Sequence, residues 1–396
     1  MVSQVLRSCI DDVQIEGIAS NAIIDWKNVL QTNTAAQMSD SSQSAGQRYP
    51  VEAIRPIIEK LFVARGMDDS KAVCVTDALM KADGMGHTTH GLALAPWYLE
   101  ALRSGAMTGT GDVTVIHDRG SCLTWEGNHL PGAWLIGKAM DVALERIKQH
   151  GVVTVVIRNS HHTGALAVYL PRLAEIGFLV HLINSGPGAA GVAPFGGTRG
   201  VFTPNPIAMG VPTPADPILI DISTSITTLN SARQLAARGE RFHGAWAMDA
   251  NGQPSDDPAI VIDGGGTLLP VGGLDHGHKG YGMTLMAEAM TQGLAGYGRA
   301  DKPVGTTLGI FLQVIDPEAF VGSQAFVRQT GWMVDACHAN QPASSNKPVR
   351  LPGELGLAKL AKMHEIGLHL SGRVVAALQP WVDQAGLRWP EPICVQ

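Results

Sequence analysis

The sequence predicts an α/β fold, in which short buried strands alternate with amphipathic helices. The run 152–157 (Val-Val-Thr-Val-Val-Ile) is almost entirely β-branched and short, which is typical of a buried strand. Residues 178–183 repeat this pattern. A helix that ends at Gly177 is expected between the two runs, over 165–174, and a long amphipathic helix is expected before them, over 133–149. This alternation indicates the α/β class.

The composition fits a large globular protein and excludes several kinds of partner. The chain has 396 residues, of which 45% are hydrophobic and 16% charged. A net charge of −6 without a long basic run argues against a nucleic-acid partner. No apolar stretch approaches the roughly 20 residues of a membrane span, so no membrane partner is expected. The five cysteines are scattered and form no CxxC pair, which indicates reduced thiols and a cytoplasmic protein: Cys9, Cys74, Cys122, Cys337 and Cys394.

The first 47 residues are expected to be a flexible extension. Residues 31–48 are small, polar and low in complexity, as in a linker. Arg7 and Asp11 interrupt the place where a signal peptide would have its apolar segment. Met38 stands where an ordinary start would precede the first helix, so we interpret residues 1–37 as an upstream addition without a role in the fold.

The remaining elements divide the chain into three further regions. A helical, substrate-side region is predicted over 48–125, a cofactor-binding mixed-sheet domain over 126–330, and C-terminal helices that pack on the 48–125 region over 331–396. The expected helices lie at 51–65, 70–83, 92–103, 133–149, 165–174, from about 226 to 238, 282–296 and after residue 354, with two helices at the C-terminus. The expected strands lie at 113–116, 122–125, 152–157, 178–183, 217–221 and 307–315.

Two loops carry clustered histidines. One is the turn 158–164, which follows a predicted strand and holds His161 and His162. The other is the glycine-rich loop 84–91, which holds His87 and His90. Histidine is the side chain most easily poised near neutral pH, and chemistry in α/β folds gathers at strand ends. Either turn could instead hold only a local hydrogen-bond network.

A GxGxxG pattern (Gly186, Gly188, Gly191) follows the strand 178–183, but we reject a Rossmann site there. The motif needs a helix N-terminus to receive the pyrophosphate and an acid about 20 residues later. The continuation 192–206 is rich in proline and glycine, and no helix can start in it.

Two further segments could hold an anion. The strand that ends at Asp221 runs into hydroxyl side chains, which could bind a phosphate or sugar or could simply cap the next helix. Lys279 lies between glycines at the start of a predicted helix, which favours an anion over a solvated face.

Three chemistries remain open from these residues. In the first, the histidines build a metal site for hydrolysis, although no acid sits at the offset of an HExxH motif. In the second, one imidazole moves a proton while a nicotinamide cofactor exchanges hydride with a 2-hydroxy acid. In the third, the protein only binds a small molecule. Hydride transfer is the leading interpretation.

Several ordered motifs resemble the malate/L-lactate dehydrogenase family of the second type, which includes ureidoglycolate dehydrogenase, sulfolactate dehydrogenase, 2,3-diketogulonate reductase and piperideine-2-carboxylate reductase. The resemblance runs from about residue 50 to 370. The motifs are Arg158-Asn159-Ser160-x-His162-x-Gly164, Asn184-Ser185, residues 192–197, residues 205–208, Asp221-x-Ser223-x-Ser225, Trp246-Ala247-x-Asp249-x-x-Gly252 and residues 279–282.

This resemblance implies an NAD- or NADP-dependent oxidoreductase with a non-Rossmann mixed-sheet fold, a small helical unit from the N- and C-terminal parts, a small-molecule substrate and a homodimer. By the same resemblance, His162 and His90 are the acid–base candidates, and His161 is a neighbour that tunes the site. Thr89, Tyr98 and Ser160 would contact the substrate. No metal is implied. The cofactor would be bound by Ser185, Asp221, Ile222, Ser223, Thr224, Ser225, His278, Lys279, Gly353 and Glu354.

The implied reaction joins hydride transfer at C2 of a 2-hydroxy or 2-oxo acid to proton transfer by histidine. Reduction of a cyclic imine 2-carboxylate is the alternative within the family, and metal-dependent hydrolysis is the distant one. The chain departs from the family at Leu94, where many members have an arginine that clamps the substrate carboxylate. A pocket lined by Leu94, Pro96 and Trp97 would favour an apolar or aromatic 2-oxo acid.

Overall fold

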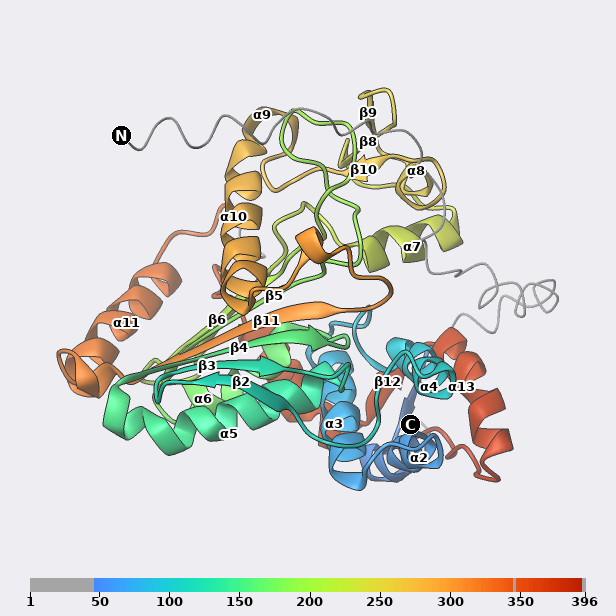
Figure 1. Cartoon of the computed structure of the whole chain (residues 1–396), viewed down its shortest axis with the longest axis horizontal. Coiled ribbons are helices and arrows are strands. Elements are labelled where there is room, and N and C mark those ends of the chain that lie inside the picture. Colours follow the sequence, from blue (N-terminus) through green and yellow to red (C-terminus); the bar gives the residue numbers. More distant parts are fainter. Residues whose placement is uncertain (1–45, 345–346, 394–396) are drawn as a thin grey trace. The chain divides into compact units, whose positions relative to one another are not determined.

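The structure is a computed structural model that describes residues 46–344 and 347–393. Its centre is one mixed sheet of seven strands in the spatial order β2-β3-β4-β11-β5-β6-β7 (Figure 1). Neighbouring strands are antiparallel, except that β3 and β4 are parallel. The strands are β2 (Thr114–Asp118), β3 (Cys122–Glu126), β4 (Val152–Ser160), β5 (Leu179–Ser185), β6 (Ile207–Val211), β7 (Ile218–Ile222) and β11 (Leu308–Ile315).

The sequence predicted six of these strands, and β6 is the one it missed. β6 contains Gly210, which lowers strand propensity. Its place is secured by pairing with β5 on one side and β7 on the other. A Cβ at Gly210 would lie 2.8 Å from Val180 and 3.1 Å from Ala174, so the glycine lets this strand lie close to its neighbours.

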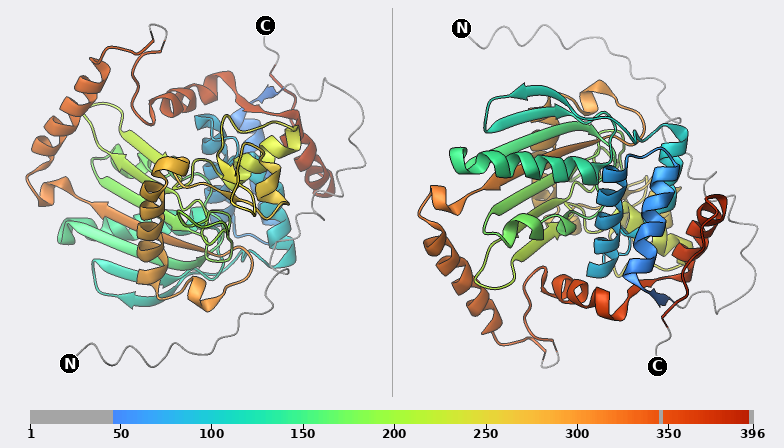
Figure 2. Two further views of the ribbon diagram at one scale, coloured as in Figure 1. Left: turned by 90° about the horizontal axis from the view of Figure 1, so that it is seen from above. Right: turned by 90° about the horizontal axis from the view of Figure 1, so that it is seen from below.

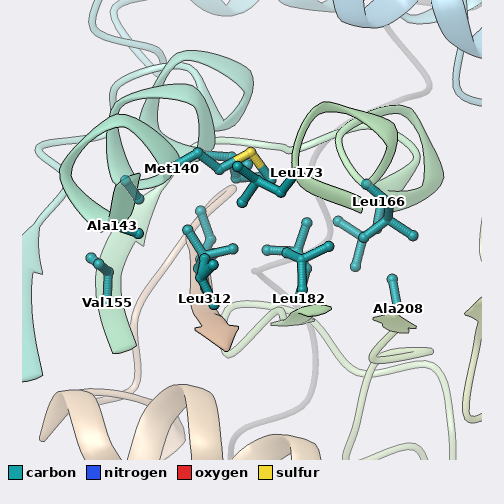
Figure 3. Close-up of a cluster of buried hydrophobic side chains, with 14 of the residues drawn as sticks. Met140, Ala143, Val155, Leu166, Leu173, Leu182, Ala208 and Leu312 are labelled. Atoms are coloured by element: carbon teal, nitrogen blue, oxygen red, sulfur yellow. The ribbon is translucent and has the colours of Figure 1, made fainter. Parts of the chain in front are cut away.

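Helices cover both faces of the sheet (Figures 1 and 2). On one face lie α5 (Gly132–His150), a 3-10 turn (Leu166–Val168) and α6 (Pro171–Ala174), packed on alternate residues of the central strands. Figure 3 shows this core, in which Met140 of α5 lies near Leu173 over Leu312 and Leu182. On the other face, Phe311 packs with Ala287 of α10 (His278–Glu288) and with Ala295. Alternation along β11 therefore separates two cores.

The helix predicted over 165–174 is wrong as a continuous element. The segment forms the 3-10 turn Leu166–Val168 and then the single turn α6. Pro171 lacks an N–H group and therefore cannot continue a helix that arrives from Leu166, but it suits the first position of a new one. The helix predicted over 282–296 begins earlier, at His278, and contains a π-helical turn, Ala289–Gly293, before its last two helical residues at 294–295.

A second core lies in a helical unit formed by segments from both ends of the described chain. Strand β1 pairs with β12, which joins the two ends. The helices α12 and α13 contact α3 and α2, respectively. The division of the chain into the four predicted domains remains a prediction. The elements of this unit are β1 (Gln47–Tyr49), α2 (Val51–Ala64), α3 (Asp69–Met85), α4 (Ala95–Ser104), α12 (Glu354–Ile366), β12 (Leu368–Leu370) and α13 (Gly372–Gln384).

A third, smaller cluster surrounds a three-stranded sheet of order β10-β8-β9. Its members are β8 (Ala247–Met248), β9 (Pro254–Ser255), β10 (Thr267–Leu268), α7 (Leu229–Arg238) and α8 (Ala259–Ile262). The single-turn α9 (Gly273–His276) precedes α10.

Helix α11 (Ser323–His338) was not predicted from the sequence. Only Thr330 of its 16 residues is buried, and Figures 1 and 2 show the helix at the margin of the sheet. Trp332 is 67% exposed on it. Among the described residues, none of its apolar side chains joins a buried cluster.

The described residues contain three of the five cysteines. Cys74, Cys122 and Cys337 are unpaired, and no helix there is long and apolar enough to cross a membrane. Positions 1–45 of the predicted extension 1–47, which include Cys9 and Met38, lie outside the described residues, as does Cys394. Gln47, at the end of that extension, already belongs to strand β1 and pairs with β12.

Candidate active site

The first part of the site is the turn after β4. Asn159 ends the strand with a φ of 52°, a left-handed conformation that asparagine tolerates better than most side chains. Its amide donates to Glu126 (Nδ2–Oε2, 3.1 Å) and accepts from Thr307 (Oγ1–Oδ1, 2.9 Å). The strand end is thus anchored to β3 and to the segment before β11. This anchoring fixes where His162 emerges.

Two donors converge on Nδ1 of His162. The Tyr98 hydroxyl lies 2.6 Å from this nitrogen, and the backbone N–H of Gly164 donates to it over 3.2 Å. A backbone N–H can only donate, so Nδ1 acts as an acceptor, and the hydroxyl of Tyr98 donates as well. We assign the proton of the neutral ring to Nε2 on these partners. Tyr98 therefore orients His162, in addition to any substrate contact.

The ring of His162 is neutral at physiological pH. Burial lowers its pKa well below the usual value, and the neighbouring His90 and His161 lower it further. Tyr98 is buried, and burial raises its pKa well above the usual value, so its hydroxyl keeps its proton. The resting pair is a neutral phenol that donates to a neutral imidazole.

His90 faces the same place from the other loop. Its ring lies parallel to that of His162, with 6.1 Å between centroids and 14° between planes. Its Nδ1 is 2.8 Å from the hydroxyl of Thr89. Burial lowers the pKa of His90 to about 4, with a smaller contribution from His87. The structure thus brings together both histidines that the sequence selected, each with a hydroxyl partner.

An aromatic wall closes the back of this pair. The indole of Trp97 lies 5.2 Å from the ring of His162 and 5.3 Å from that of His161. His161 is completely buried, and neither of its ring nitrogens has a hydrogen-bond partner among the described residues. Burial, with a smaller contribution from His129, lowers the pKa of His161 to about 3. Leu94 is 7% exposed and packs in the helical core, so it contributes an apolar backing.

A cavity of about 600 Å³ lies beside the His90 loop. Its walls come from the end of α3, the end of β7, the segment 350–353 and α12. Three of the residues selected for cofactor binding line it: Asp221, Ile222 and Gly353. His87, Arg350 and Lys359 also line it. None of these three residues was predicted from the sequence to bind the cofactor. These side chains come together near Gly353 because the ends of α3 and α12 meet in the fold, and the sequence alone does not show this meeting.

Asp221 joins the cavity to the His162 turn. Its Oδ2 accepts the N–H of Ala167 over 2.8 Å, so the carboxyl group caps the 3-10 turn that follows the histidines. Burial raises the pKa of Asp221, while the Ala167 N–H and His87 act in the opposite direction.

The other selected hydroxyls are engaged within the protein. Ser160 and Ser185 are completely buried. Ser160 donates to the carbonyl of His161 over 2.6 Å, and Ser185 contacts Thr291 and Gln292 of the π-helical turn at 2.6 and 2.9 Å. Ser223, Thr224 and Ser225 donate to the carbonyls of Ser225, Pro204 and Thr227, respectively. A substrate contact of Ser160 and cofactor contacts of the other four side chains remain predictions. Because their protons are engaged, these contacts would have to come from hydroxyl lone pairs or from the backbone.

The last three selected residues lie outside the lining of this cavity. His278 and Lys279 are exposed in the first turn of α10, and the ring of His278 lies 5.8 Å from Phe195. Glu354 begins α12 and pairs with Nε2 of His338 over 2.5 Å. In the described residues, no three His, Cys, Asp or Glu side chains are grouped closely enough to hold a metal ion.

Comparison with known proteins decides the family. Residues 49–379 match the model of the malate/L-lactate dehydrogenase family. The chain belongs to this family. It is an oxidoreductase of the dehydrogenase type, which confirms the resemblance read from the ordered motifs.

Relatives match over most of their own length. An L-lactate dehydrogenase of Cupriavidus necator is 31% identical over 326 residues, which cover 80% of this chain and 91% of that protein. A malate/(S)-sulfolactate dehydrogenase of Methanothermus fervidus is 29% identical over 344 residues, which cover 85% and 97%.

Solved structures confirm the fold of this malate/L-lactate dehydrogenase family member. Malate dehydrogenase from Pyrococcus horikoshii superimposes with a TM-score of 0.78 at 25% identity, over 90% of this chain and 99% of that one. Malate dehydrogenase from Entamoeba histolytica has a TM-score of 0.82 at 23% identity, over 88% and 100%, and supports the fold alone.

The family fold agrees with the rejection of a Rossmann site at the GxGxxG pattern. No helix follows the loop 186–191, and the next named element is strand β6. Arg299 donates to the carbonyls of Gly186 and Ala189 over 3.0 and 2.7 Å and pairs with Glu288 over 3.0 Å. Arg299 thus holds this loop without a helix N-terminus, which a Rossmann phosphate site requires.

Proposed function

We propose that this family member transfers hydride between NAD or NADP and C2 of a 2-hydroxy or 2-oxo carboxylic acid, with His162 as the acid–base residue. One observation carries the proposal. An imidazole oriented by Tyr98 lies parallel to that of His90, and the His90 loop contributes His87 to the wall of a cavity that is also lined by predicted cofactor residues. This is the arrangement of a proton carrier and its orienting partner next to a ligand site.

The cavity suits part of a dinucleotide. Its volume of about 600 Å³ is within the usual range of ligand pockets. Arg350 and Lys359 can pair with phosphate oxygens. Gly353 has a φ of 97°, and a Cβ there would lie 2.7 Å from Leu219, so glycine lets the segment 350–353 pack closely on β7 to form this wall. A nicotinamide cofactor supplies or accepts the hydride when it is bound.

Nε2 of His162 is the atom that exchanges the proton. Nδ1 is engaged by Tyr98 and Gly164, which leaves Nε2 for a substrate oxygen. For reduction, the ring must carry protons on both nitrogens. Nδ1–H can then donate to the Tyr98 oxygen, because a phenol both donates and accepts. The proton on Nε2 passes to the substrate oxygen, and the ring is left as the neutral tautomer that carries its proton on Nδ1. Loss of that proton and uptake of another on Nε2 restore the resting tautomer.

The substrate itself supplies the reason for this protonation. A 2-oxo acid brings a carboxylate into a site whose imidazoles are neutral. A nearby negative charge favours the protonated imidazole and raises its pKa. Binding of the oxo acid should therefore be accompanied by proton uptake, which prepares His162 for the reaction.

Absorbance of the reduced nicotinamide tests the proposal. Both cofactors should be paired with a panel of 2-oxo acids, and at least one pair should show enzyme-dependent oxidation. His162→Ala should lower kcat by about 10²–10⁴-fold while the cofactor Kd stays unchanged. Near-normal turnover in that variant, together with loss in His90→Ala, would move the role to His90. No oxidation with any pair would reject the proposal.

The substrate side chain is expected to be apolar or aromatic. Leu94 stands where many family members have an arginine, and it packs in the core. Trp97 places an indole against both His161 and His162. A wall of this kind favours burial of apolar surface, at about 25 cal/mol per Å². We expect kcat/KM for phenylpyruvate to exceed that for oxaloacetate, and a preference for oxaloacetate would refute the expectation.

Cyclic-imine reduction is the second candidate. The chain superimposes on Δ1-piperideine-2-carboxylate reductase from Pseudomonas syringae with a TM-score of 0.75 at 25% identity, over 85% of this chain and 99% of that one. An imine nitrogen at C2 makes the same demand on His162 as a carbonyl oxygen. The same absorbance panel separates the two when piperideine-2-carboxylate is included.

We also expect a homodimer. Besides Trp332, the segment before α11 exposes Phe320 (66%) and Val321 (79%). Apolar side chains gathered in this way mark an interaction surface. Trp332→Glu should shift the mass measured by light scattering toward the monomer, and an unchanged dimer would place the interface elsewhere.

A further inference from the structure

We propose that Asp83 is a positioning residue, whose carboxyl group holds the returning end of the His90 loop and thereby fixes His90 opposite His162. The proposal rests on the proposed function, because it gives a catalytic purpose to a contact outside the reacting groups. Asp83 belongs to the last turn of α3, and none of the proton-transfer steps uses it.

The loop leaves and rejoins α3 within a few residues. Gly86 ends the helix with a φ of 91°, and the N–H of His87 still donates to the carbonyl of Ala82 over 2.7 Å. The N–H of His90 then donates to the carbonyl of His87 over 2.8 Å. The chain is therefore a tight reversal that carries His90 on its outgoing side.

Asp83 closes this reversal. Its Oδ2 accepts the N–H of Leu92 over 2.7 Å, two residues after His90. Leu92 itself is completely buried in the helical core, so its N–H needs this acceptor. The bond ties the returning chain to the helix from which the loop started.

The carboxyl group also lies flat against Gly91. A Cβ on that residue would lie 2.1 Å from Oδ1, 2.2 Å from Cγ and 2.4 Å from Oδ2 of Asp83. Gly91 has a negative φ (−91°), so the close approach of the carboxyl group, and not a left-handed conformation, calls for glycine at this position. His90 is bonded to Gly91, and any change at this contact moves the imidazole.

The contact affects catalysis because it helps to set the distance between the imidazoles of His90 and His162. The two parallel imidazoles lie 6.1 Å apart, and misplacement of a positioned group by about 1 Å can cost about 10²-fold in rate. Burial raises the pKa of Asp83 to about 7, and the Leu92 N–H opposes that rise. Both the carboxylate and the neutral acid have an oxygen that can accept this N–H, so the contact persists across that pKa.

Three variants test the proposal. Asp83→Ala removes the acceptor, Asp83→Asn keeps an acceptor of the same size, and Gly91→Ala pushes on the same contact from the other side. Asp69→Ala, in the exposed first turn of α3, is the matched control. Two readouts are needed: amide hydrogen exchange of the segment 86–94, which does not depend on activity, and steady-state kcat with the cofactor Kd.

We expect Asp83→Ala and Gly91→Ala to speed exchange in 86–94 and to lower kcat at least about tenfold, with the cofactor Kd within about twofold. Asp83→Asn should retain kcat within about fivefold. The double variant Asp83→Ala/Gly91→Ala should lose less than the product of the two single losses, because both act on one contact.

Three results would overturn the proposal. They are unchanged exchange and kcat in Asp83→Ala, an Asp83→Asn variant as impaired as Asp83→Ala, or losses spread evenly over exchange in the whole chain and cofactor binding. A wild-type protein inactive on every oxo acid and imine would instead reject the proposed function, and the exchange result would still decide whether Asp83 holds the loop.

Discussion

Substitution of Tyr98 by phenylalanine isolates the bond that orients His162. The ring and its contact with Trp97 (5.3 Å between centroids) remain, and only the hydroxyl 2.6 Å from Nδ1 is lost. Gly164 still donates to Nδ1, but over 3.2 Å. The imidazole would then be free to tilt away from the orientation that presents Nε2 to the substrate.

The magnitude follows from the kind of bond. A hydrogen bond to a group that becomes charged contributes about 1.5–3 kcal/mol, and 1.36 kcal/mol corresponds to a tenfold change in rate. Tyr98→Phe should therefore lower kcat by about 10- to 100-fold, less than the loss expected for His162→Ala. The cofactor Kd should not change, because the bond lies outside the cavity lined by Arg350 and Lys359.

The assay is steady-state reduction of the best oxo acid, with Tyr49→Phe as the control. Tyr49 is also buried and loses one hydrogen bond, to Gln47 over 2.9 Å, but its hydroxyl does not bond to an imidazole. Control activity should stay near wild type. A Tyr98→Phe variant with wild-type kcat, or one altered only in KM, would refute the orienting role.

Three further predictions concern protons, stability and substrate charge. Binding of a 2-oxo acid should take up about one proton, measured as a dependence of the binding enthalpy on the ionisation enthalpy of the buffer, and no dependence would refute ligand-coupled protonation of His162. The pKa of His161 is lowered to about 3 in the folded state, against 6.5 in the unfolded chain. Stability from this neutral histidine is therefore present above pH 6.5 and is lost as the pH falls below it, so His161→Asn should flatten the fall in unfolding free energy between pH 6 and 4 by about 1.4 kcal/mol per pH unit, as measured by urea titration. Leu94→Arg should raise kcat/KM for oxaloacetate relative to phenylpyruvate if an arginine can reach the ligand from that position, and loss of folding measured by circular dichroism would show that the leucine is needed in the core.

Six of the seven strands of the sheet were predictable because each is a short, largely apolar run with a clear boundary, whereas β6 was missed. Val152 to Ile157 and Leu308 to Ile315 alternate between two cores, and this pattern is local. The prediction of one helix over 165–174 was wrong because it relied on the apolar periodicity and gave too little weight to Pro171. Helix α11 was missed because its apolar residues do not face a core of this chain, so burial offers no periodic signal.

The sequence could identify which histidines belong to the site, but it could not predict their hydrogen-bond partners. Nothing in the order of the chain says that the Tyr98 hydroxyl reaches Nδ1 of His162, 64 positions away. The same holds for Arg350 and Lys359, which join Asp221 only through the meeting of α12 with α3. The resemblance to the family supplied Tyr98 as a substrate-side residue, whereas its role as an orienting donor came from geometry.

The loop 86–92 connects the two parts of the site, which are the cavity and the pair of imidazoles. His87 lines the cavity, and three residues later His90 faces His162. His87 also acts electrostatically on both Asp221 and His90. A negatively charged ligand in the cavity would therefore act on the imidazoles through a segment already in contact with them. Because Asp83 holds the end of that segment, the position of His90 should respond to the ligand by small shifts of a fixed loop, and not by ordering of a free one.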